Sequence, residues 1–308
     1  MRLSSPQAIA ALTAALLLVL WWSSKEDKQV PTAAKKIVST PEVQTRSPDP
    51  KGGPPRPPPP PAPAKPIEAI ETSKQLGDGR PAGSVKFRVI DDWVVGFGDI
   101  LLGKPSREDY PEEGFTSAPK VELWPDGRIP YSIHVDLYDP ERVLRVVEYF
   151  NTHTGLKLVP YESGPDSVVF APFRDHCLSY LGRIGGHQPI FLDDRCRDGE
   201  IMHEVMHAAG FVHEHSRPDR DRYVKINWDN VEDLKKDQFE IVPESLAKNV
   251  KDRPFDLRSI MIYNENAFAK DRSSWTLKSV SGEKIDPPFE GLSREDIDRI
   301  RMTYGSAR

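Results

Sequence analysis

Cysteine is scarce in this chain: the 308 residues include two, Cys177 and Cys196, both in the second half. A lipid anchor would need a cysteine directly behind an apolar leader, and none stands there. Excess positive charge is also lacking, because 42 lysines and arginines face 47 aspartates and glutamates, which gives a net charge of −5. Such a chain has no electrostatic footprint for nucleic acid, so we expect no nucleic-acid partner.

The N-terminus carries a short apolar run. Arg2 precedes AIAALTAALLLVLWW, from Ala8 to Trp22, and the charged SSKEDK follows. The run is at the short end for a membrane-spanning helix and suits the core of a signal peptide. No small-x-small cleavage motif follows it, so an uncleaved signal anchor fits as well. We expect residues 1–24 to direct export, with the protein either released to the periplasm or outside, or tethered to the membrane by residues 8–22.

Two segments separate this leader from the main domain. Residues 25–74 include KGGPPRPPPPPAPAKP and are expected to form a disordered proline-rich linker, since consecutive prolines favour an extended spacer that buries nothing. Residues 75–118 contain VKFRVIDDWVVGFGDILLG, whose β-branched and aromatic residues predict short strands up to Gly103. The acidic, turn-rich stretch from there to Pro119 is expected to be exposed and cleavable.

The main domain, residues 119–308, mixes helices and strands. Ile129, Tyr131, Ile133 and Val135 alternate with polar residues and predict a strand with one buried face. Apolar runs at 156–159, 168–171 and 190–192 predict further strands. No regular alternation of strand and helix is visible, so the pattern predicts one α+β domain.

Two helices have recognisable ends. In DPERVLRVVEYFN, Asp139 is the predicted N-cap and Pro140 the first helical residue, with an apolar stripe through Val143, Val147 and Phe150. In LSREDIDRIRMTYG, Ser293 is the predicted N-cap and Gly305 the residue that ends the helix.

The stretch HEVMHAAGFVH carries the chemistry. On a helix capped by Asp198, residues four apart share a face, so His203 and His207 can direct two ring nitrogens at one point. A catalytic zinc needs three protein ligands and one position for water. Gly210 can adopt the left-handed conformation that ends a helix, which lets the chain turn and bring in His213 as the third ligand.

Glu204 lies beside the first ligand and projects toward the water rather than the metal. It is therefore the candidate general base, which takes the proton of the attacking water and delivers it to the leaving amine. The simpler alternative is an exposed helix with incidental histidines, which becomes improbable once Gly210 and His213 stand at the required offsets. His215 does not have a ligand's offset, so we expect it at the surface or supporting a ligand.

The segment from His203 to Asp221, HEVMHAAGFVHEHSRPDRD, resembles the signature of the astacin metallopeptidases in the metzincin clan. Four other segments resemble the same family in the same order, so the resemblance covers about 120–305: WPDGRIPY, CLSYLGRIGGHQPIFL, SIMIY and GLSREDIDRI. It implies a metzincin, or zincin-like, domain with a twisted mixed sheet, an active-site helix, an irregular lower half with a Met-turn, and a C-terminal helix. It also implies one zinc ion per chain.

The resemblance assigns further roles. Met261 would form the floor beneath the zinc, although an ordinary core methionine would look the same in sequence. Tyr263 would be an additional, displaceable zinc ligand that hydrogen-bonds the oxyanion, the alternative being a buried structural tyrosine. Glu214 would hold the new N-terminus of the mature enzyme through water. The charged residues that follow would form framework ion pairs: Arg217, Asp219, Arg220 and Asp221.

Cys177 and Cys196 match the inner cysteine pair of the family, which implies a disulfide, and export permits one. The second bridge of the family's animal members has no cysteines here. The chain also lacks any N-x-S/T sequon. Together these absences suggest a bacterial-type member.

The family's zymogens carry an F-x-G-D-type motif whose aspartate binds the zinc in place of water. Here GFGDI has Gly98, Asp99 and Ile100 in register, but its phenylalanine, Phe97, comes one position late. Asp99 is therefore the candidate zinc ligand of a latent form, the alternative being a solvated turn aspartate.

These features predict a secreted or membrane-tethered zinc-dependent endopeptidase, made as a latent zymogen, that hydrolyses peptide bonds with a zinc-bound water activated by Glu204. Its partners would be protein or peptide substrates and an unidentified activating protease. Two alternatives stay open: a non-catalytic, zinc-stabilised binding or adhesion module on a proline-rich stalk, and a hydrolase of cell-wall or small peptides.

Overall fold

The computed structural model describes residues 87–103, 121–250, 252–288 and 290–305. All of them belong to one compact unit, Pro57–Arg308, and the other unit, Met1–Arg56, lies outside the described residues. The predicted leader, the proline-rich linker and the predicted cleavable stretch at 104–119 therefore fall outside the description as well. None of the helices within the described ranges is both long and apolar enough to cross a bilayer.

An eight-stranded mixed sheet forms the frame, in the order β1-β2-β3-β7-β8-β6-β4-β5. Its neighbours β5, β4, β6 and β8 are parallel, β7 runs antiparallel to β8, and β3 pairs with β7 in parallel. The strands in chain order are β1 Phe87–Ile90, β2 Trp93–Gly96, β3 Ile100–Gly103, β4 Arg128–Ile133, β5 Lys157–Pro160, β6 Ser167–Pro172, β7 Leu178–Tyr180 and β8 His187–Leu192.

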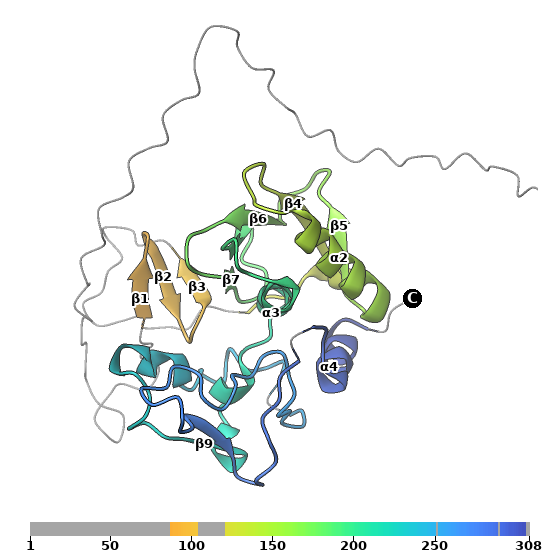
Figure 1. Cartoon of the computed structure of the whole chain (residues 1–308). Coiled ribbons are helices and arrows are strands. Elements are labelled where there is room, and N and C mark those ends of the chain that lie inside the picture. Colours follow the sequence, from red (N-terminus) through yellow and green to blue (C-terminus); the bar gives the residue numbers. More distant parts are fainter. Residues whose placement is uncertain (1–86, 104–120, 251, 289, 306–308) are drawn as a thin grey trace, which may run out of the picture. The chain divides into compact units, whose positions relative to one another are not determined.

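Helices α2 (Glu141–His153) and α3 (Asp198–Ala208) pack against each other and against this sheet (Figure 1). Burial follows the period of each element: Val143, Val147 and Phe150 of α2 are buried, and alternate residues of β8 are buried. The largest apolar cluster lies here, and burying such side chains is the main favourable contribution to folding. The α+β prediction, with helices and a mixed sheet, is confirmed.

The chain after Ala209 is mostly irregular. It contains three short 3-10 turns (Glu214–Ser216, Arg220–Arg222 and Asp233–Phe239, named η2, η3 and η4) and an antiparallel pair, β9 Val224–Ile226 with β10 Leu277–Ser279. Helix α4 (Arg294–Tyr304) closes the domain; as predicted, its N-cap Ser293 accepts a hydrogen bond from the Asp296 amide, and Gly305 follows its last turn at φ 89°.

Three local predictions were wrong. Asp139 has φ 43°, so the helix begins one residue later than expected, with Pro140 at the N-cap. At α3 the N-cap is Arg197, and Asp198 is already helical with its carboxylate bonded to Arg145. Strand β4 ends at Ile133, so Val135 is 76% exposed rather than buried.

The N-terminal meander, residues 87–103 with strands β1 to β3, extends the sheet of the main domain. Beyond the β3–β7 pairing, the Ser179 amide donates to the Asp99 carbonyl at 3.2 Å. A separate apolar cluster joins the meander to β7, formed by Val95, Leu101, Leu178 and Tyr180. The meander is therefore docked by both backbone pairing and apolar burial.

Candidate metal centre

His203 and His207 lie one turn apart on α3, and a backbone carbonyl orients each ring. The Nδ1 atom of His203 lies 2.9 Å from the Ile260 carbonyl oxygen, and that of His207 lies 2.8 Å from the Phe211 oxygen. A carbonyl oxygen only accepts, so both Nδ1 atoms carry the proton. The Nε2 lone pairs are consequently free to face a common point, which is the usual arrangement of metal-binding histidines.

Gly210 brings the third histidine to the same point. Its φ is 91°, and an added Cβ would lie 3.0 Å from Asn249 Nδ2 and 3.2 Å from Val121 Cγ1, so both conformation and space favour glycine. The predicted sharp turn after α3 is confirmed. Beyond it, His213 directs its Nδ1 at the Phe97 carbonyl oxygen, 3.0 Å away, and leaves its Nε2 free in turn.

The geometry of these rings fits a metal ion. The Nε2 atoms of His203 and His213 are 3.0 Å apart, although neither carries a proton to share if both Nδ1 atoms donate. Burial lowers the pKa of His207 to about 4, which keeps its lone pair available at neutral pH. A zinc ion binds imidazole nitrogens at about 2.0 Å, and ligands at tetrahedral angles then lie about 3.3 Å apart. A zinc between the rings would satisfy all three lone pairs.

Asp99 of the meander reaches the same point. Its Oδ1 lies 2.9 Å from His207 Nε2 and 3.3 Å from His213 Nε2, and its Oδ2 lies 3.6 Å from His203 Nε2. One ligand atom from each of these four residues falls within 4.8 Å of the others. Burial opposes the charge of Asp99, but the attraction of His213, together with hydrogen bonds to His203 and His207, outweighs it and holds the carboxyl pKa well below its usual value.

Gly98 and Phe97 explain how the meander enters the site. Gly98 has φ 107°, and a Cβ there would lie 2.8 Å from both His213 Cε1 and the Tyr263 hydroxyl, so only glycine fits. Phe97, one position later than in the family's motif, is 3% exposed and packs in the largest apolar cluster. The shifted phenylalanine therefore still anchors the segment.

Glu204 stands beside the ligands without joining them. It is 2% exposed, and its Oε2 has no hydrogen-bond partner among the described residues. Burial raises its pKa well above the usual value, and the negative charge of Asp99 adds to this. A buried carboxyl group with an unused oxygen next to a metal site is a candidate proton acceptor.

Tyr263 lies beside His213, with the two ring centroids 5.2 Å apart. Its hydroxyl donates to Gln238 Oε1 at 3.0 Å, and its ring stacks on His215 with centroids 4.0 Å apart. His215 is fully buried, so the surface position considered for it was wrong. Met261 is 1% exposed in the largest apolar cluster. Gln238 carried no signal in the sequence, because it lies 25 residues from Tyr263 with no motif between them.

Glu214 follows the third histidine and is fully buried among cations. Its Oε1 accepts from Arg217 at 2.9 Å and its Oε2 from Arg299 at 2.8 Å, while the Asp256 amide donates to Oε1 at 2.7 Å. Arg217 also pairs with Asp219, and Arg220 with Asp221, as framework ion pairs would. Glu214 as a holder of a new N-terminus stays a prediction; here its carboxylate joins α4 to the site. The sequence patterns did not single out Arg299.

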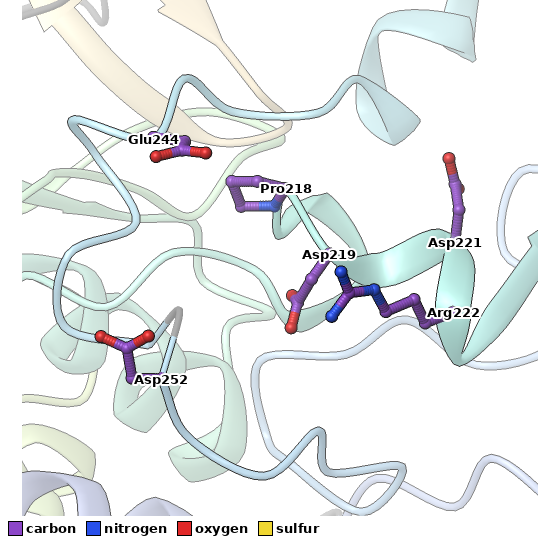
Figure 2. Close-up of a pocket in the computed structure, with 6 residues that line it drawn as sticks. All are labelled: Pro218, Asp219, Asp221, Arg222, Glu244 and Asp252. Atoms are coloured by element: carbon purple, nitrogen blue, oxygen red, sulfur yellow. The ribbon is translucent and has the colours of Figure 1, made fainter.

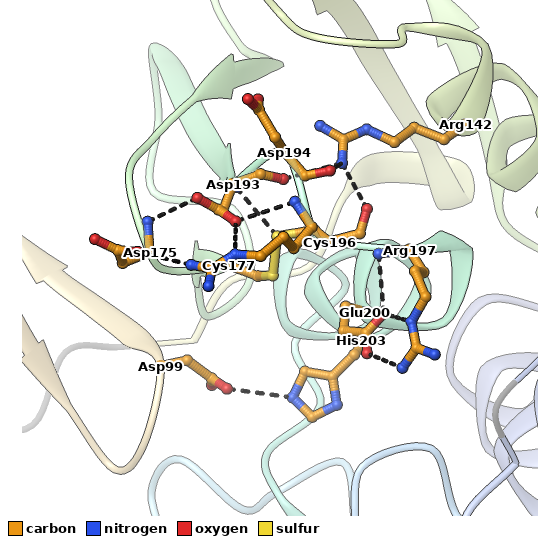
Figure 3. Close-up of a disulfide and its surroundings, with 11 residues drawn as sticks. Asp99, Arg142, Asp175, Cys177, Asp193, Asp194, Cys196, Arg197, Glu200 and His203 are labelled. Carbon is orange, nitrogen blue, oxygen red and sulfur yellow. Dashed lines mark hydrogen bonds and ion pairs between the residues drawn. A yellow bond between two sulfur atoms is a disulfide. The ribbon is translucent and has the colours of Figure 1, made fainter.

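Cys177 and Cys196 form a disulfide, as the resemblance implied (Figure 3). It joins the residue before β7 to the loop before α3, so it ties an inner strand of the sheet to the helix that carries His203 and His207. Arg142 of α2, 3% exposed, donates to the carbonyl oxygens of Asp193 and Cys196 in that loop at 2.9 and 2.6 Å. In Figure 3, Asp99 and His203 face each other across the space beneath α3.

A cavity of about 490 Å³ lies elsewhere in the irregular half (Figure 2). It is lined by Pro218, Asp219, Asp221, Arg222, Glu244 and Asp252, so none of the clustered histidines contributes to it. Over the histidines, the space is filled by Phe97, Gly98 and Asp99.

Comparison with known proteins adds a family. The family model described as Astacin, a family of peptidases, matches residues 116–305. Zinc metalloproteinase nas-13 of Caenorhabditis elegans is 36% identical over 184 residues, covering 59% of this chain and 40% of nas-13. Zinc metalloproteinase nas-4 of the same nematode is 32% identical over 227 residues, covering 70% of this chain and 72% of nas-4. The chain thus spans less than half of nas-13 and most of nas-4.

Among solved structures, High choriolytic enzyme 1, a hatching enzyme zinc-protease from the medaka fish Oryzias latipes, is similar with a TM-score of 0.55 and 29% identity. The match covers 62% of this chain and 97% of that one. The predicted metzincin-like fold is confirmed. The suggestion of a bacterial-type member is not borne out, since these relatives come from a nematode and a fish.

Proposed function

The chain belongs to the astacin family of peptidases, and from this premise we propose that it is an exported, zinc-dependent endopeptidase kept latent by its own N-terminal meander. One observation carries the proposal: three imidazole Nε2 atoms and the Asp99 carboxylate converge on one point while Glu204 stays free. In this proposal residues 1–24 direct export, 25–74 are a linker, 75–118 are a pro-segment and 119–308 form the catalytic domain.

The metal would be held by His203, His207 and His213, and when bound it supplies Lewis-acid polarisation of the scissile carbonyl and of the attacking water. The carbonyl-bound Nδ1 atoms keep the rings oriented before the metal arrives, and burial lowers the pKa of His207 so that this ring is neutral. Met261 would pack beneath this site as part of the apolar cluster.

Glu204 would act as the general base. Burial raises the pKa of this carboxyl group, which makes its carboxylate a stronger base. The carboxylate would accept the proton of the attacking water and return it to the leaving amine. Burial holds the pKa of Tyr263 well above its usual value, with Asp99 adding to the effect, so its hydroxyl stays protonated and can donate to the developing oxyanion. In the latent chain that hydroxyl is bonded to Gln238 instead.

Protein or peptide substrates follow from this chemistry. A non-catalytic binding module would have no use for a buried carboxyl group with an unused oxygen, so Glu204 favours turnover over the adhesion alternative. A digest of a peptide library would separate general proteolysis from hydrolysis of small or cell-wall peptides. Tethering by residues 8–22 stays a prediction, and these residues lie outside the described part of the chain.

The test of the activity uses the processed protein with casein as substrate. Chelator should abolish cleavage and added zinc restore it. Glu204→Ala should keep the metal, measured by elemental analysis, and lower turnover by about 10² to 10⁴. The matched control is Glu200→Ala, one turn earlier on α3 and bonded to Arg197, which should keep its activity. Full activity in Glu204→Ala would exclude the assigned base.

Latency is tested on the unprocessed chain. Asp99→Ala removes the carboxylate from the histidine cluster and should raise cleavage of a short fluorogenic peptide at least about tenfold, since even 1.4 kcal/mol of lost docking shifts the equilibrium that far. Asp92→Ala, an exposed residue of the same meander, is the matched control and should leave the precursor silent. A silent Asp99→Ala precursor would remove Asp99 from the latent state.

A further inference from the structure

Gln238 of η4 connects the meander to Tyr263. Its carboxamide is 3% exposed, and Oε1 accepts the Tyr263 hydroxyl at 3.0 Å. On the other side Nε2 donates to the Gly98 carbonyl oxygen at 3.4 Å and to Asp237 Oδ2 at 3.3 Å. One buried side chain therefore touches both the segment that carries Asp99 and the candidate oxyanion donor.

Two acceptors determine which way this carboxamide points, the Gly98 carbonyl and the Asp237 carboxylate. Both groups only accept, so the amide must offer them the NH₂ group, and this turns Oε1 toward the tyrosine. The Tyr263 hydroxyl can donate or accept, so it alone would not choose between the two amide orientations. Of the two acceptors, only Gly98 belongs to the meander, so docking adds one of the two contacts that hold the amide in place.

Gly98 also fills the space between the tyrosine and the ligands. A Cβ on Gly98 would lie 2.8 Å from the Tyr263 hydroxyl and 2.8 Å from His213 Cε1, so the glycine backbone lies against both. While it stays there, the hydroxyl has no room to approach the cluster from this side.

The rest of Tyr263 is already held by the main domain. The His215 ring stacks on its ring, the His215 Nε2 donates to the Gln238 carbonyl oxygen at 3.2 Å, and the Tyr263 amide donates to His215 Nδ1 at 3.4 Å. His215 thus ties the two backbones together, and the position of the hydroxyl is left to the Gln238 side chain.

We propose that Gln238 is a positioning residue that couples docking of the meander to the position of the Tyr263 hydroxyl. With Gly98 in place, the carboxamide holds the hydroxyl away from the histidine cluster. When the meander leaves, Nε2 keeps Asp237 but loses the Gly98 acceptor, and the Gly98 backbone no longer lies against the hydroxyl, so the carboxamide is held less firmly and the hydroxyl is released toward the site. This inference rests on the proposed function, because it gives Tyr263 a role in the reaction.

The test measures hydrogen exchange of the Ser179 amide in the full unprocessed chain, stripped of metal with chelator. That amide donates to the Asp99 carbonyl, so its exchange reports undocking of the meander. Gln238→Met keeps the size of the side chain and removes all three polar contacts of the carboxamide, which should speed exchange about tenfold. Tyr263→Phe should speed it about fivefold, and the double variant about tenfold rather than about fiftyfold, because the two groups act as one unit.

Two controls keep the result specific. Gln188→Met alters another buried glutamine that bridges backbone groups, between the Gly182 carbonyl and the Ile184 amide, and should leave the relative exchange of Ser179 unchanged. The amides of Val205 and Met206 in α3 monitor global unfolding. Gln238→Asn keeps the carboxamide but is too short to span both partners, so it should also speed exchange several-fold.

Unchanged Ser179 exchange in Gln238→Met and Gln238→Asn, equal acceleration in α3, or a double variant near fiftyfold would each overturn the coupling. None of these results depends on catalysis. Failure of the casein assay would instead count against the proposed activity, so the two failures remain distinguishable.

Discussion

The half of the domain that contains the sheet and the half that follows Gly210 are stabilised by different interactions. In the first, β4 to β8 and helices α2 and α3 supply most of the largest apolar cluster, to which the second half adds residues such as Met261 and Ile300. The second has a smaller apolar cluster around Phe239 and Ile262 and fully buried charges, with Glu214 between Arg217 and Arg299. Regular structure satisfies its own backbone, whereas an irregular chain needs side chains to do this.

The candidate metal centre lies where these two halves meet. Two histidines come from α3, and the third comes from the irregular half, as do Met261 and Tyr263. The bond from His203 Nδ1 to the Ile260 carbonyl crosses the junction, so this histidine also fastens the halves together. The site therefore depends on the polar half as much as on the apolar one.

The largest expected effect on stability comes from breaking the buried charge cluster. Arg299→Met leaves Glu214 buried with one cation fewer, and removal of one partner of a buried pair costs about 3–5 kcal/mol. Urea unfolding of the metal-free chain measures this. Arg145→Met is the matched control: its partner is Asp198 at 2.7 Å, but its side chain is 55% exposed, so solvent screens the pair and the loss of stability should be much smaller. Equal costs for the two variants would contradict the distinction between the halves.

The disulfide should come second. The double substitution Cys177→Ser and Cys196→Ser opens a loop of 19 residues in the half that contains the sheet. Loop entropy predicts that the free energy of unfolding falls by about 3 kcal/mol. Because the bridge ties β7 to the start of α3, the loss of stability should appear in the sheet half. Hydrogen exchange should become faster in β7 and α3 and should increase less around η3. A double variant as stable as the parent in urea would show that the loop is held by Arg142 alone.

The smallest effect concerns a carboxylate in the same loop. Hydrogen bonds from the Arg195 side chain lower the pKa of Asp193 to about 2, from an ordinary value near 3.8. Ionised Asp193 therefore stabilises the fold above pH 3.8, and this contribution is lost as the pH falls through about 2. After allowance for the exposed Arg195, Asp193→Asn should cost about 1 kcal/mol at pH 6.

Thermal unfolding at pH 6 and near pH 2 checks this prediction. The difference between Asp193→Asn and the parent should shrink toward zero near pH 2. A difference that stays constant with pH would mean that the backbone amides of Asp175 and Arg195, rather than the charge, account for the interaction.

Local patterns predicted the elements well and their ends less well. The alternation around Ile129 and the stripe through Val143 correspond to β4 and α2, because burial has the period of the element. The predicted helix starts were wrong by one residue, because Asp139 adopts φ 43° and the carboxylate of Asp198 binds Arg145 instead of capping the helix. The capping hydrogen bond of a side chain competes with tertiary interactions of that side chain, and the neighbouring sequence does not reveal those partners.

The local sequence alone predicts the arrangement of the three histidines: two lie one turn apart on a helix, a glycine lets the chain turn, and the third lies beyond it. These depend on helix period and backbone conformation, which neighbouring residues dictate. Only the tertiary structure decided that Gln238 meets Tyr263, that Arg299 meets Glu214, and that His215 is buried. Such pairs are made by packing distant segments of chain, and no local pattern records which segments will touch.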